Sequence, residues 1–168
     1  MGAAFDKARW TRFLRMDRVL RDVVDDDIPI FFEQQNDPEA IETAAFPPRE
    51  WEPFVEHWNK IRENPTCVTK TIVSDGEVVG NVLSWSRDDG RVVGYWLGRE
   101  YWGRGLATRA LGELIEELER PLYAEVSTTN IGSIRVLEKC GFEVIGKTVE
   151  HQEAFGGDIE LLVMRLVG

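Results

Sequence analysis

The residues best placed to do chemistry lie in the segment 94–108. A strand-like run ends at Leu97, and two glycines two positions apart, Gly103 and Gly105, come just before an amphipathic helical pattern. Glycine permits dihedral angles and a close backbone approach that a Cβ would forbid. The first amides of a helix have no intrahelical acceptors and lie at the positive end of its dipole, so such a loop binds phosphate groups. The segment and the helix after it also hold three arginines, at Arg99, Arg104 and Arg109.

The glycine spacing by itself leaves two interpretations open. It suits a phosphate site, and it equally suits a tight strand-to-helix turn in which glycine provides only the bend. The segment is not a Walker loop, because the Gly-Lys-Ser/Thr ending is missing. It also differs from the dinucleotide fingerprint, since no Gly-x-Gly-x-x-Gly is present.

A second candidate segment covers residues 130–142. Asn130 is a suitable N-cap for a helix, and Ser133 follows three residues later. Gly141 suits the left-handed position that ends many helices. A capping side chain can still contact a ligand, so capping and binding are compatible at Asn130. For Ser133 the structural and the functional interpretation both stay open.

Together the two segments resemble the GNAT superfamily of N-acetyltransferases. The run from Trp102 to Thr108 looks like their acetyl-CoA pyrophosphate loop, Arg/Gln-x-x-Gly-x-Gly/Ala, although Trp102 departs from its first position. Residues 130–142 resemble the family's Asn-x-x-Ser…Glu-Lys-x-Gly-Phe segment. The Tyr-Trp-Gly-basic-Gly run is similar to the ribosomal-protein N-terminal (Rim-type) branch. The resemblance covers most of residues 18–166.

The resemblance implies acetyl-CoA as co-substrate, no metal, and direct transfer of the acetyl group to a primary amine in a ternary complex. It places the backbone of Leu97 and Arg99 along the pantetheine arm. The Leu97 amide would also act in catalysis as a donor to the thioester oxygen, and Ser133 is counted with the catalytic residues. The remaining cofactor contacts that it implies are Trp102, Gly103, Arg104, Gly105, Leu106, Ala107, Thr108, Asn130 and Ser133.

Two positions where relatives carry proton-transfer residues are apolar in this chain. Val92 stands where a glutamate is common, and Leu137 stands where a tyrosine often protonates the departing thiolate. Loss of that acid is tolerable, because a thiolate with a pKa near 8.5 leaves without much help. Glu125, in the middle of an expected strand, is the first candidate for a general base, with a solvated strand face as the alternative. His57 and His151 have less support.

The acceptor is not named by the sequence. The formal net charge is −10, which excludes the basic footprint of nucleic-acid binding and permits a cationic partner such as a polyamine or an aminoglycoside. Solubility alone explains the charge equally well. A lysine-like amine costs about 4.6 kcal/mol to deprotonate at pH 7, whereas an α-amine costs about 1 kcal/mol. Because the sequence offers few candidates for a general base, an acceptor that loses its proton easily is favoured, such as a peptide N-terminus or another amine of low pKa. Trp85 and Trp96 are the aromatic residues best placed to line an acceptor pocket. A non-catalytic acyl-CoA-binding module is the rival from another class.

Hydrophobic periodicity predicts an α/β fold, GNAT-like, with a mixed, mostly antiparallel central sheet and helices on both faces. Expected strands are 18–24, 67–74, 78–86, 91–97, 122–127, 142–149 and 158–166. Expected helices are a short one through residues 30–32, one from the prolines at 47 and 48 to about 64, one over 106–118, and one over 131–140. The strands near 92 and 126 should be parallel.

The 168 residues suit one acetyltransferase domain over residues 1–168. We expect no membrane contact, because no run approaches the length of a spanning helix, and Met1 to Asp17 lack a secretory signal. Cys67 and Cys140 match neither a disulfide framework nor a zinc site, which favours a cytoplasmic protein. The last strand can pair with a second copy, so a homodimer stays open.

Overall fold

The computed structural model describes residues 18–168. The expectation about a secretory signal concerns residues 1–17 and lies outside them. The elements follow in the order β1 (Leu20–Asp22), α2 (Asp27–Gln35), α3 (Pro38–Ala44), α4 (Trp51–Glu63), β2 (Val68–Ser74), β3 (Glu77–Arg87), β4 (Gly90–Leu97), the 3-10 turn η1 (Arg99–Tyr101), α5 (Leu106–Glu116), β5 (Leu122–Ser127), α6 (Ile131–Lys139), β6 (Glu143–Gln152), the 3-10 turn η2 (Glu153–Phe155) and β7 (Gly157–Leu166).

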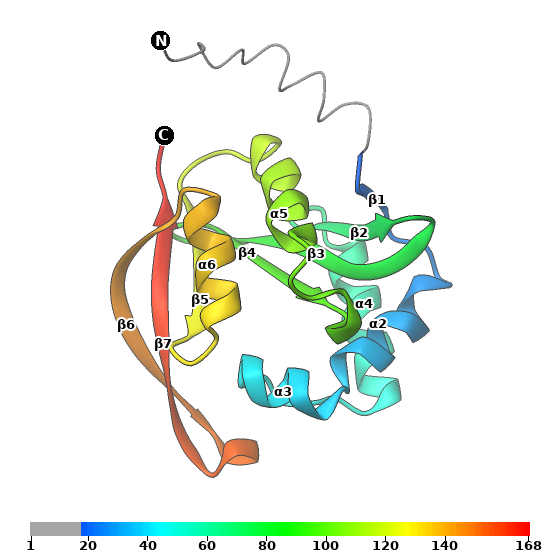
Figure 1. Cartoon of the computed structure of the whole chain (residues 1–168), viewed down its shortest axis with the longest axis horizontal. Helices are drawn as coiled ribbons and strands as arrows, with labels where there is room; N and C mark the ends of the chain where they lie inside the picture. Colours follow the sequence, from blue (N-terminus) through cyan, green and yellow to red (C-terminus); the bar gives the residue numbers. More distant parts are fainter. Residues whose placement is uncertain (1–17) are drawn as a thin grey trace.

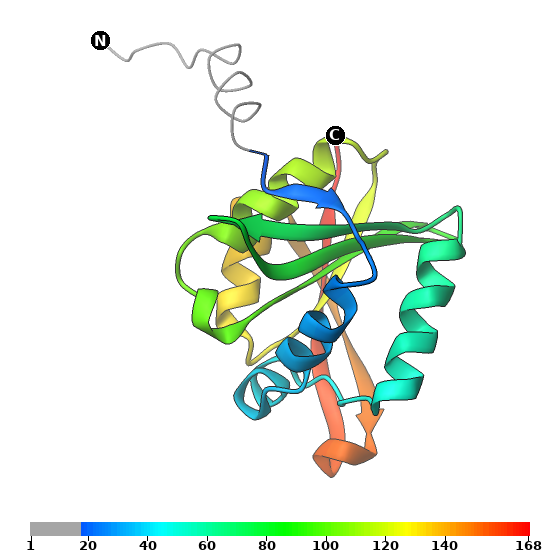
Figure 2. The same ribbon diagram turned by 90° about the vertical axis from the view of Figure 1, so that its right-hand side faces the viewer.

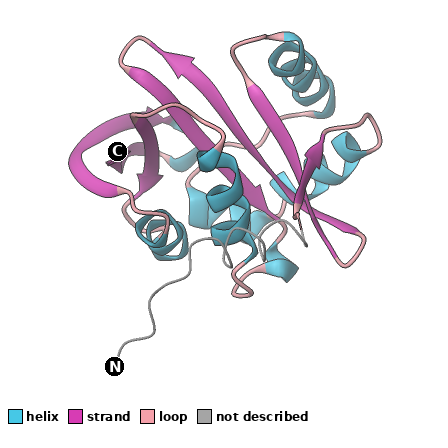
Figure 3. Cartoon of the chain, turned by 90° about the horizontal axis from the view of Figure 1, so that it is seen from above, coloured by secondary structure: helices cyan, strands magenta, loops and turns pink. Residues whose placement is uncertain are grey.

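The described strands form one sheet in the order β1-β2-β3-β4-β5-β7-β6 (Figure 1). Neighbouring strands run antiparallel except β4 and β5, which are parallel, as the sequence predicted. Helices α5 and α6 cover one face, whereas α2 and α4 cover the other (Figures 2 and 3). This confirms the expected fold class, a mixed and mostly antiparallel sheet between two helical layers.

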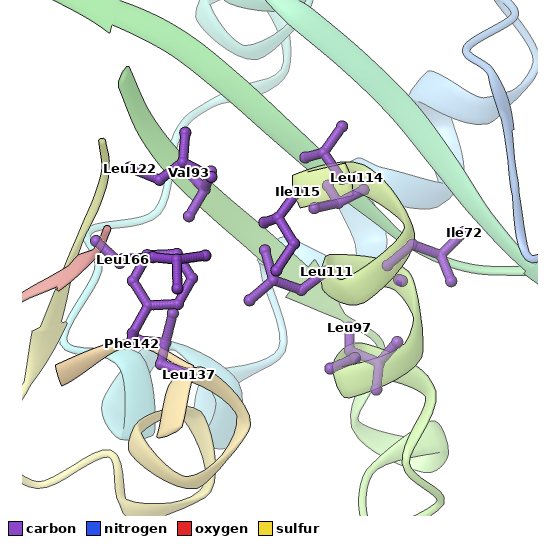
Figure 4. Close-up of a cluster of buried hydrophobic side chains, with 14 of the residues drawn as sticks. Ile72, Val93, Leu97, Leu111, Leu114, Ile115, Leu122, Leu137, Phe142 and Leu166 are labelled. Atoms are coloured by element: carbon purple, nitrogen blue, oxygen red, sulfur yellow. The ribbon is translucent and has the colours of Figure 1, made fainter. Parts of the chain in front are cut away.

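Two hydrophobic clusters hold the layers together. The larger one packs α5 and α6 on the sheet through fully buried residues such as Leu111, Leu114 and Leu122 (Figure 4). The smaller one joins α2 and α4 to the opposite face. Successive residues of β3 take part in different clusters, Val82 in the larger and Leu83 in the smaller, because side chains alternate across a strand.

The N-terminal part differs from the sequence prediction in three ways. Strand β1 is only three residues long, and α2 extends well beyond the short helix that we expected. Helix α3 was not predicted as a helix at all, so three helices rather than two precede β2. Its start has a local cause, since the Asp37 side chain accepts hydrogen bonds from the Glu39 and Ala40 N–H groups, at 3.1 Å each, and Pro38 opens the helix.

Asp27, the first residue of α2, makes a buried polar centre. Its carboxylate accepts both arms of Arg21, at 2.6 and 2.8 Å, together with the Thr71 hydroxyl and the Val24 N–H. Burial alone would raise the pKa of Asp27, but these donors outweigh it and hold the pKa below its usual value. Asp27 thereby fixes β1 and β2 to the start of α2.

Candidate functional site

The site begins where β4 and β5 part. The two strands pair only at Arg91 with Leu122 and at Val92 with Tyr123. Beyond that point β4 continues to Leu97, while the rest of β5 pairs with β7 on its other side. A wedge-shaped gap therefore opens between the carboxyl ends of two parallel strands, which is a common place for ligands in α/β sheets.

Backbone groups of β4 are directed into this gap. Gly98 N–H donates to the Val79 carbonyl at 2.8 Å on the β3 side, and Arg91 N–H donates to the Pro121 carbonyl at 3.4 Å on the β5 side. Because hydrogen-bonding direction alternates along a strand, the N–H groups of Tyr95 and Leu97 face the gap. The Leu97 carbonyl accepts the Trp102 indole N–H at 3.0 Å. The structure therefore leaves two amides, two residues apart, for an extended ligand.

A cavity of about 270 Å³ occupies the wide end of the gap. Its walls come from α3, β4, the loop before α5, and the start of α6. The described lining residues are all uncharged, and most of the exposed lining is apolar. They are Ala40, Thr43, Ala44, Tyr95, Trp96, Leu97, Trp102, Gly103, Ala107, Asn130, Gly132, Ser133 and Val136.

The loop before α5 has the geometry of an anion cradle. Gly103 and Gly105 have φ values of 76° and 75°, a region that residues with a Cβ rarely adopt. A Cβ built on either glycine would meet no protein atom within 4 Å, so the space beside them is open. The first turn of α5 has neither an acidic residue nor a side-chain cap, which leaves its N–H groups for a ligand. These features fit the pyrophosphate of acetyl-CoA.

The three arginines of this region differ in their partners, and Arg109 lies 4.0 Å from Glu113 one turn further along α5. Arg99, which we expected beside the cofactor, is held by Asp37 at 3.0 Å and Glu39 at 2.7 Å, so its positive charge faces α3. Arg104 donates to the Glu100 carbonyl at 3.2 Å and lies over the Tyr101 ring. Its guanidinium thus stays beside the loop that would carry the pyrophosphate.

Asn130 and Ser133 start α6 at the cavity wall. The Asn130 side chain accepts a hydrogen bond from the Ser133 N–H at 3.2 Å, which confirms the expected cap. The Ser133 hydroxyl lies 2.7 Å from the hydroxyl of Tyr95 on β4. Burial raises the pKa of Tyr95 to about 12, although the bond to Ser133 opposes the shift.

Sequence reasoning did not single out Tyr95. The signal that could have found it is the two-residue period of a strand, since Tyr95 must face the same way as Leu97. Its contact with Ser133 depends on the tertiary placement of α6.

The apolar replacements Val92 and Leu137 are each only 3% exposed. Leu137 packs beside Phe142 in the larger cluster (Figure 4), so it stabilises the core. Cys140 caps the end of α6, and burial raises the pKa of its thiol to about 11. It is therefore a poor nucleophile, in keeping with direct transfer.

Glu125 lies in the middle of β5, as predicted. Its neighbours Ala124 and Val126 pack in the larger cluster, so Glu125 points to the opposite face of the sheet. Its carboxylate accepts a hydrogen bond from Arg87 at 2.8 Å. Glu125 is not among the described residues that line the cavity, so its role as the base stays a prediction.

The tryptophans and histidines named as candidates lie at different distances from the cavity. Trp96 lines the cavity and donates its indole N–H to the Gln34 carbonyl, whereas Trp85 is 36% exposed and is not among the described lining residues. His57 lies on α4, where burial and then the charges of Arg49 and Lys60 lower its pKa. His151 pairs with Asp158 on the β6–β7 hairpin. Only Trp96 of this group borders the candidate site.

A gap between parting strands beside a phosphate-binding helix start is typical of a protein that holds an extended ligand ending in phosphate groups. The chain matches the family described as "Acetyltransferase (GNAT) domain" over residues 18–143. It therefore belongs to the GNAT acetyltransferase family.

A curated relative is an uncharacterized N-acetyltransferase, p20 of Bacillus licheniformis, which is 32% identical over 88 residues. That match covers 48% of this chain and 49% of the relative, so this chain spans about half the relative's length.

Solved structures share the fold at low identity. Spermidine N-acetyltransferase from Vibrio cholerae, in complex with CoA and spermine, has a TM-score of 0.75 at 17% identity, covering 88% of this chain and 93% of its own. Ribosomal-protein-alanine N-acetyltransferase from Brucella melitensis has a TM-score of 0.74 at 21% identity, covering 89% and 99%. The aminoglycoside acetyltransferase AAC(6')-Ib, in complex with coenzyme A, has a TM-score of 0.68 at 21% identity, covering 86% and 92%.

The described residues 18–168 lack two features. None of their helices has the length and apolar character needed to cross a membrane. They also hold no group of three or more histidine, cysteine, aspartate or glutamate side chains that could bind a metal ion.

Proposed function

We propose that this chain is an N-acetyltransferase that moves the acetyl group of acetyl-CoA to the α-amine of a peptide or to another amine of low pKa. One observation carries the proposal: the Tyr95 and Leu97 amides face a cavity that adjoins the glycine loop before α5. A long ligand whose arm joins a pyrophosphate to a thioester at its tip fits both parts. The complexes of structural neighbours with CoA support this cofactor.

The cofactor would use the backbone for most of its contacts. First-turn amides of α5 would hold the pyrophosphate, with Arg104 beside it, and Asn130 would contact the arm from α6. Leu97 N–H would bind the arm or polarise the thioester oxygen, and Tyr95 N–H is a second donor in the same direction. One amide aimed at a developing oxyanion contributes about 3 kcal/mol to catalysis.

The cavity lining bears on the kind of acceptor that the site would take. A polyamine or an aminoglycoside would gain from carboxylates close to its ammonium groups, but the described lining residues are uncharged. An apolar site also favours an amine that loses its proton easily near pH 7. We propose that Ser133 protonates the departing sulfur and that Glu125, on the same sheet face as Trp96, takes the amine proton through water.

The acceptor proposal is tested by CoA release from acetyl-CoA with a panel of amines at pH 7. The panel contains peptides with a free N-terminal alanine, the same peptides with a blocked N-terminus, spermidine and an aminoglycoside. We expect transfer to the free peptides alone or with a clear preference. Faster transfer to spermidine or the aminoglycoside would contradict the proposed acceptor.

A non-catalytic acyl-CoA-binding module is the second candidate, and the buried Val92 and Leu137 favour it. Such a module would bind acetyl-CoA and release CoA with no amine of the panel. The variant Gly105→Glu places a charged side chain at the pyrophosphate position and should abolish binding under either candidate function. Unchanged affinity in this variant would contradict the cofactor site itself.

A further inference from the structure

Tyr95 and Ser133 form a pair of neighbouring hydroxyl groups. In the proposed reaction Ser133 protonates the departing sulfur, whereas the Tyr95 hydroxyl has no task. The two oxygens lie 2.7 Å apart and connect the unpaired edge of β4 to the first turn of α6. Both residues line the cavity. The Tyr95 ring also packs against the larger cluster, which holds the hydroxyl in place.

The position of the pair along the gap places it near the thioester. Leu97 lies at the wide end, next to the loop before α5, whereas pairing with β5 begins at Val92. Tyr95 lies two residues deeper than Leu97, which is about 6.6 Å along a strand. A ligand whose pyrophosphate is held at α5 enters past Leu97, and its far end, the thioester, reaches the level of Tyr95.

Thioester cleavage at this depth releases a sulfur that a nearby proton donor can stabilise, even though a thiolate leaves without much help. When the C–N bond has formed, the C–S bond breaks, the electron pair goes to sulfur, and sulfur takes a proton. Leu137 cannot donate one. Among the described lining residues, the hydroxyl groups belong to Thr43, Tyr95 and Ser133. Only the last two are joined by a hydrogen bond.

We propose that Tyr95 is a positioning residue, whose hydroxyl donates to Ser133 Oγ and so directs the Ser133 proton at the departing sulfur. As sulfur takes that proton, Ser133 Oγ takes the proton of Tyr95. Glu125 takes the first proton of the ammonium group before attack, and the phenolate regains a second one from the nitrogen of the new amide through water. This second proton replaces the one that passed to sulfur. This inference rests on the proposed acetyltransferase function. Burial raises the pKa of Tyr95 to about 12, so its hydroxyl carries a proton near pH 7 before the reaction begins.

The first test is Tyr95→Phe, which removes only the hydroxyl and keeps the packed ring. The matched control is Tyr101→Phe in η1, which removes a hydroxyl that donates to Glu77 of β3. We expect kcat of Tyr95→Phe to fall tenfold or more, with KM for the amine and Kd for acetyl-CoA within twofold of wild type. The control should keep wild-type values of all three. A kcat within twofold of wild type, or a loss that lies entirely in acetyl-CoA binding, would overturn the role of Tyr95.

The second test asks whether the two hydroxyls act as a unit. Ser133→Ala should lower kcat at least as much as Tyr95→Phe, and the double variant should be no slower than Ser133→Ala alone. Multiplied effects in the double variant would contradict the relay. If Tyr95→Phe lowers the melting temperature sharply, its loss of kcat could reflect unfolding, and the comparison of Ser133→Ala with Ser133→Thr then tests the proposal. Threonine keeps the hydroxyl and should restore most of kcat, and equal loss in both variants would overturn the proposal.

Wild-type protein separates this inference from the proposed function. Wild-type turnover with a fully active Tyr95→Phe contradicts only the role of Tyr95. A wild-type chain that binds acetyl-CoA and transfers to no amine contradicts the acetyltransferase function, and the relay with it.

Discussion

Replacement of Gly105 by alanine separates cofactor binding from folding. Gly105 has a φ of 75°, and a Cβ there would meet no protein atom within 4 Å. The new methyl group therefore strains the backbone without a clash inside the protein. Left-handed geometry costs a residue with a Cβ about 1 kcal/mol, which lowers the melting temperature of a chain of this size by about 2–4 °C.

The same methyl group would stand where the pyrophosphate approaches. Displacing the phosphate from one amide loses a charge-assisted hydrogen bond worth about 1.5–3 kcal/mol, or roughly 10- to 100-fold in Kd. Gly76 supplies a matched control, because it has a φ of 77° and equally open surroundings in the turn between β2 and β3. Gly76→Ala should show the same thermal loss and bind acetyl-CoA like wild type.

The assay combines calorimetric titration with acetyl-CoA and thermal unfolding of wild type, Gly105→Ala and Gly76→Ala. We expect similar melting temperatures for the two variants and weak binding by Gly105→Ala alone. Wild-type affinity in Gly105→Ala would refute the assignment of this loop to the pyrophosphate. Equal loss of affinity in both variants would show that backbone strain, rather than the position of the methyl group, explains the change.

Three further predictions follow from the polar contacts. Asp27→Asn leaves Arg21 facing a neutral partner. We expect the free energy of unfolding to fall by about 3 kcal/mol and the melting temperature by about 6–12 °C. A shift below 2 °C would contradict a structural role of Asp27. The pKa of Asp27 is lower in the folded than in the unfolded protein. Its contribution to the free energy of unfolding is therefore complete above the unfolded pKa of about 3.9 and is lost as pH falls through the folded pKa. The melting temperatures of Asp27→Asn and wild type should thus converge in acid. If Glu125 is the base, Glu125→Gln should shift the pH profile of kcat/KM, and an unaltered profile would remove Glu125 from the mechanism.

Much of the fold could be predicted because local rules and tertiary packing agree. The Asp75-Gly76 turn sets the β2–β3 hairpin, β5 has the bounds that its apolar run indicated, and Gly141 has the left-handed φ of 93° expected after α6. The resemblance drew attention to Gly103, Asn130 and Ser133, and the structure places all three at one cavity.

The features that could not be predicted are a short helix and two side-chain contacts that depend on distant residues. The signal for α3 was present in Asp37 and Pro38, but a helix of seven residues gives no clear periodicity. The side-chain partners of Arg99 could not be predicted, because its ion pairs with Asp37 and Glu39 depend on the packing of α3, whereas its backbone contact with the pantetheine arm stays a prediction. The contact of Tyr95 with Ser133 could not be predicted, because it depends on where α6 packs. For Arg99 and Tyr95 the deciding contact joins segments far apart in the sequence.

The measurement that tests the central claim most directly is amide hydrogen exchange, residue by residue, with and without CoA. The account predicts that CoA slows exchange at Tyr95 and Leu97 in β4 and at the first-turn amides of α5, from Leu106 to Thr108. The exposed strand β6 should exchange at the same rate in both samples. Binding without protection of Leu97 and the first turn of α5, or protection confined to β6, would contradict the proposal that the gap between β4 and β5 holds the cofactor.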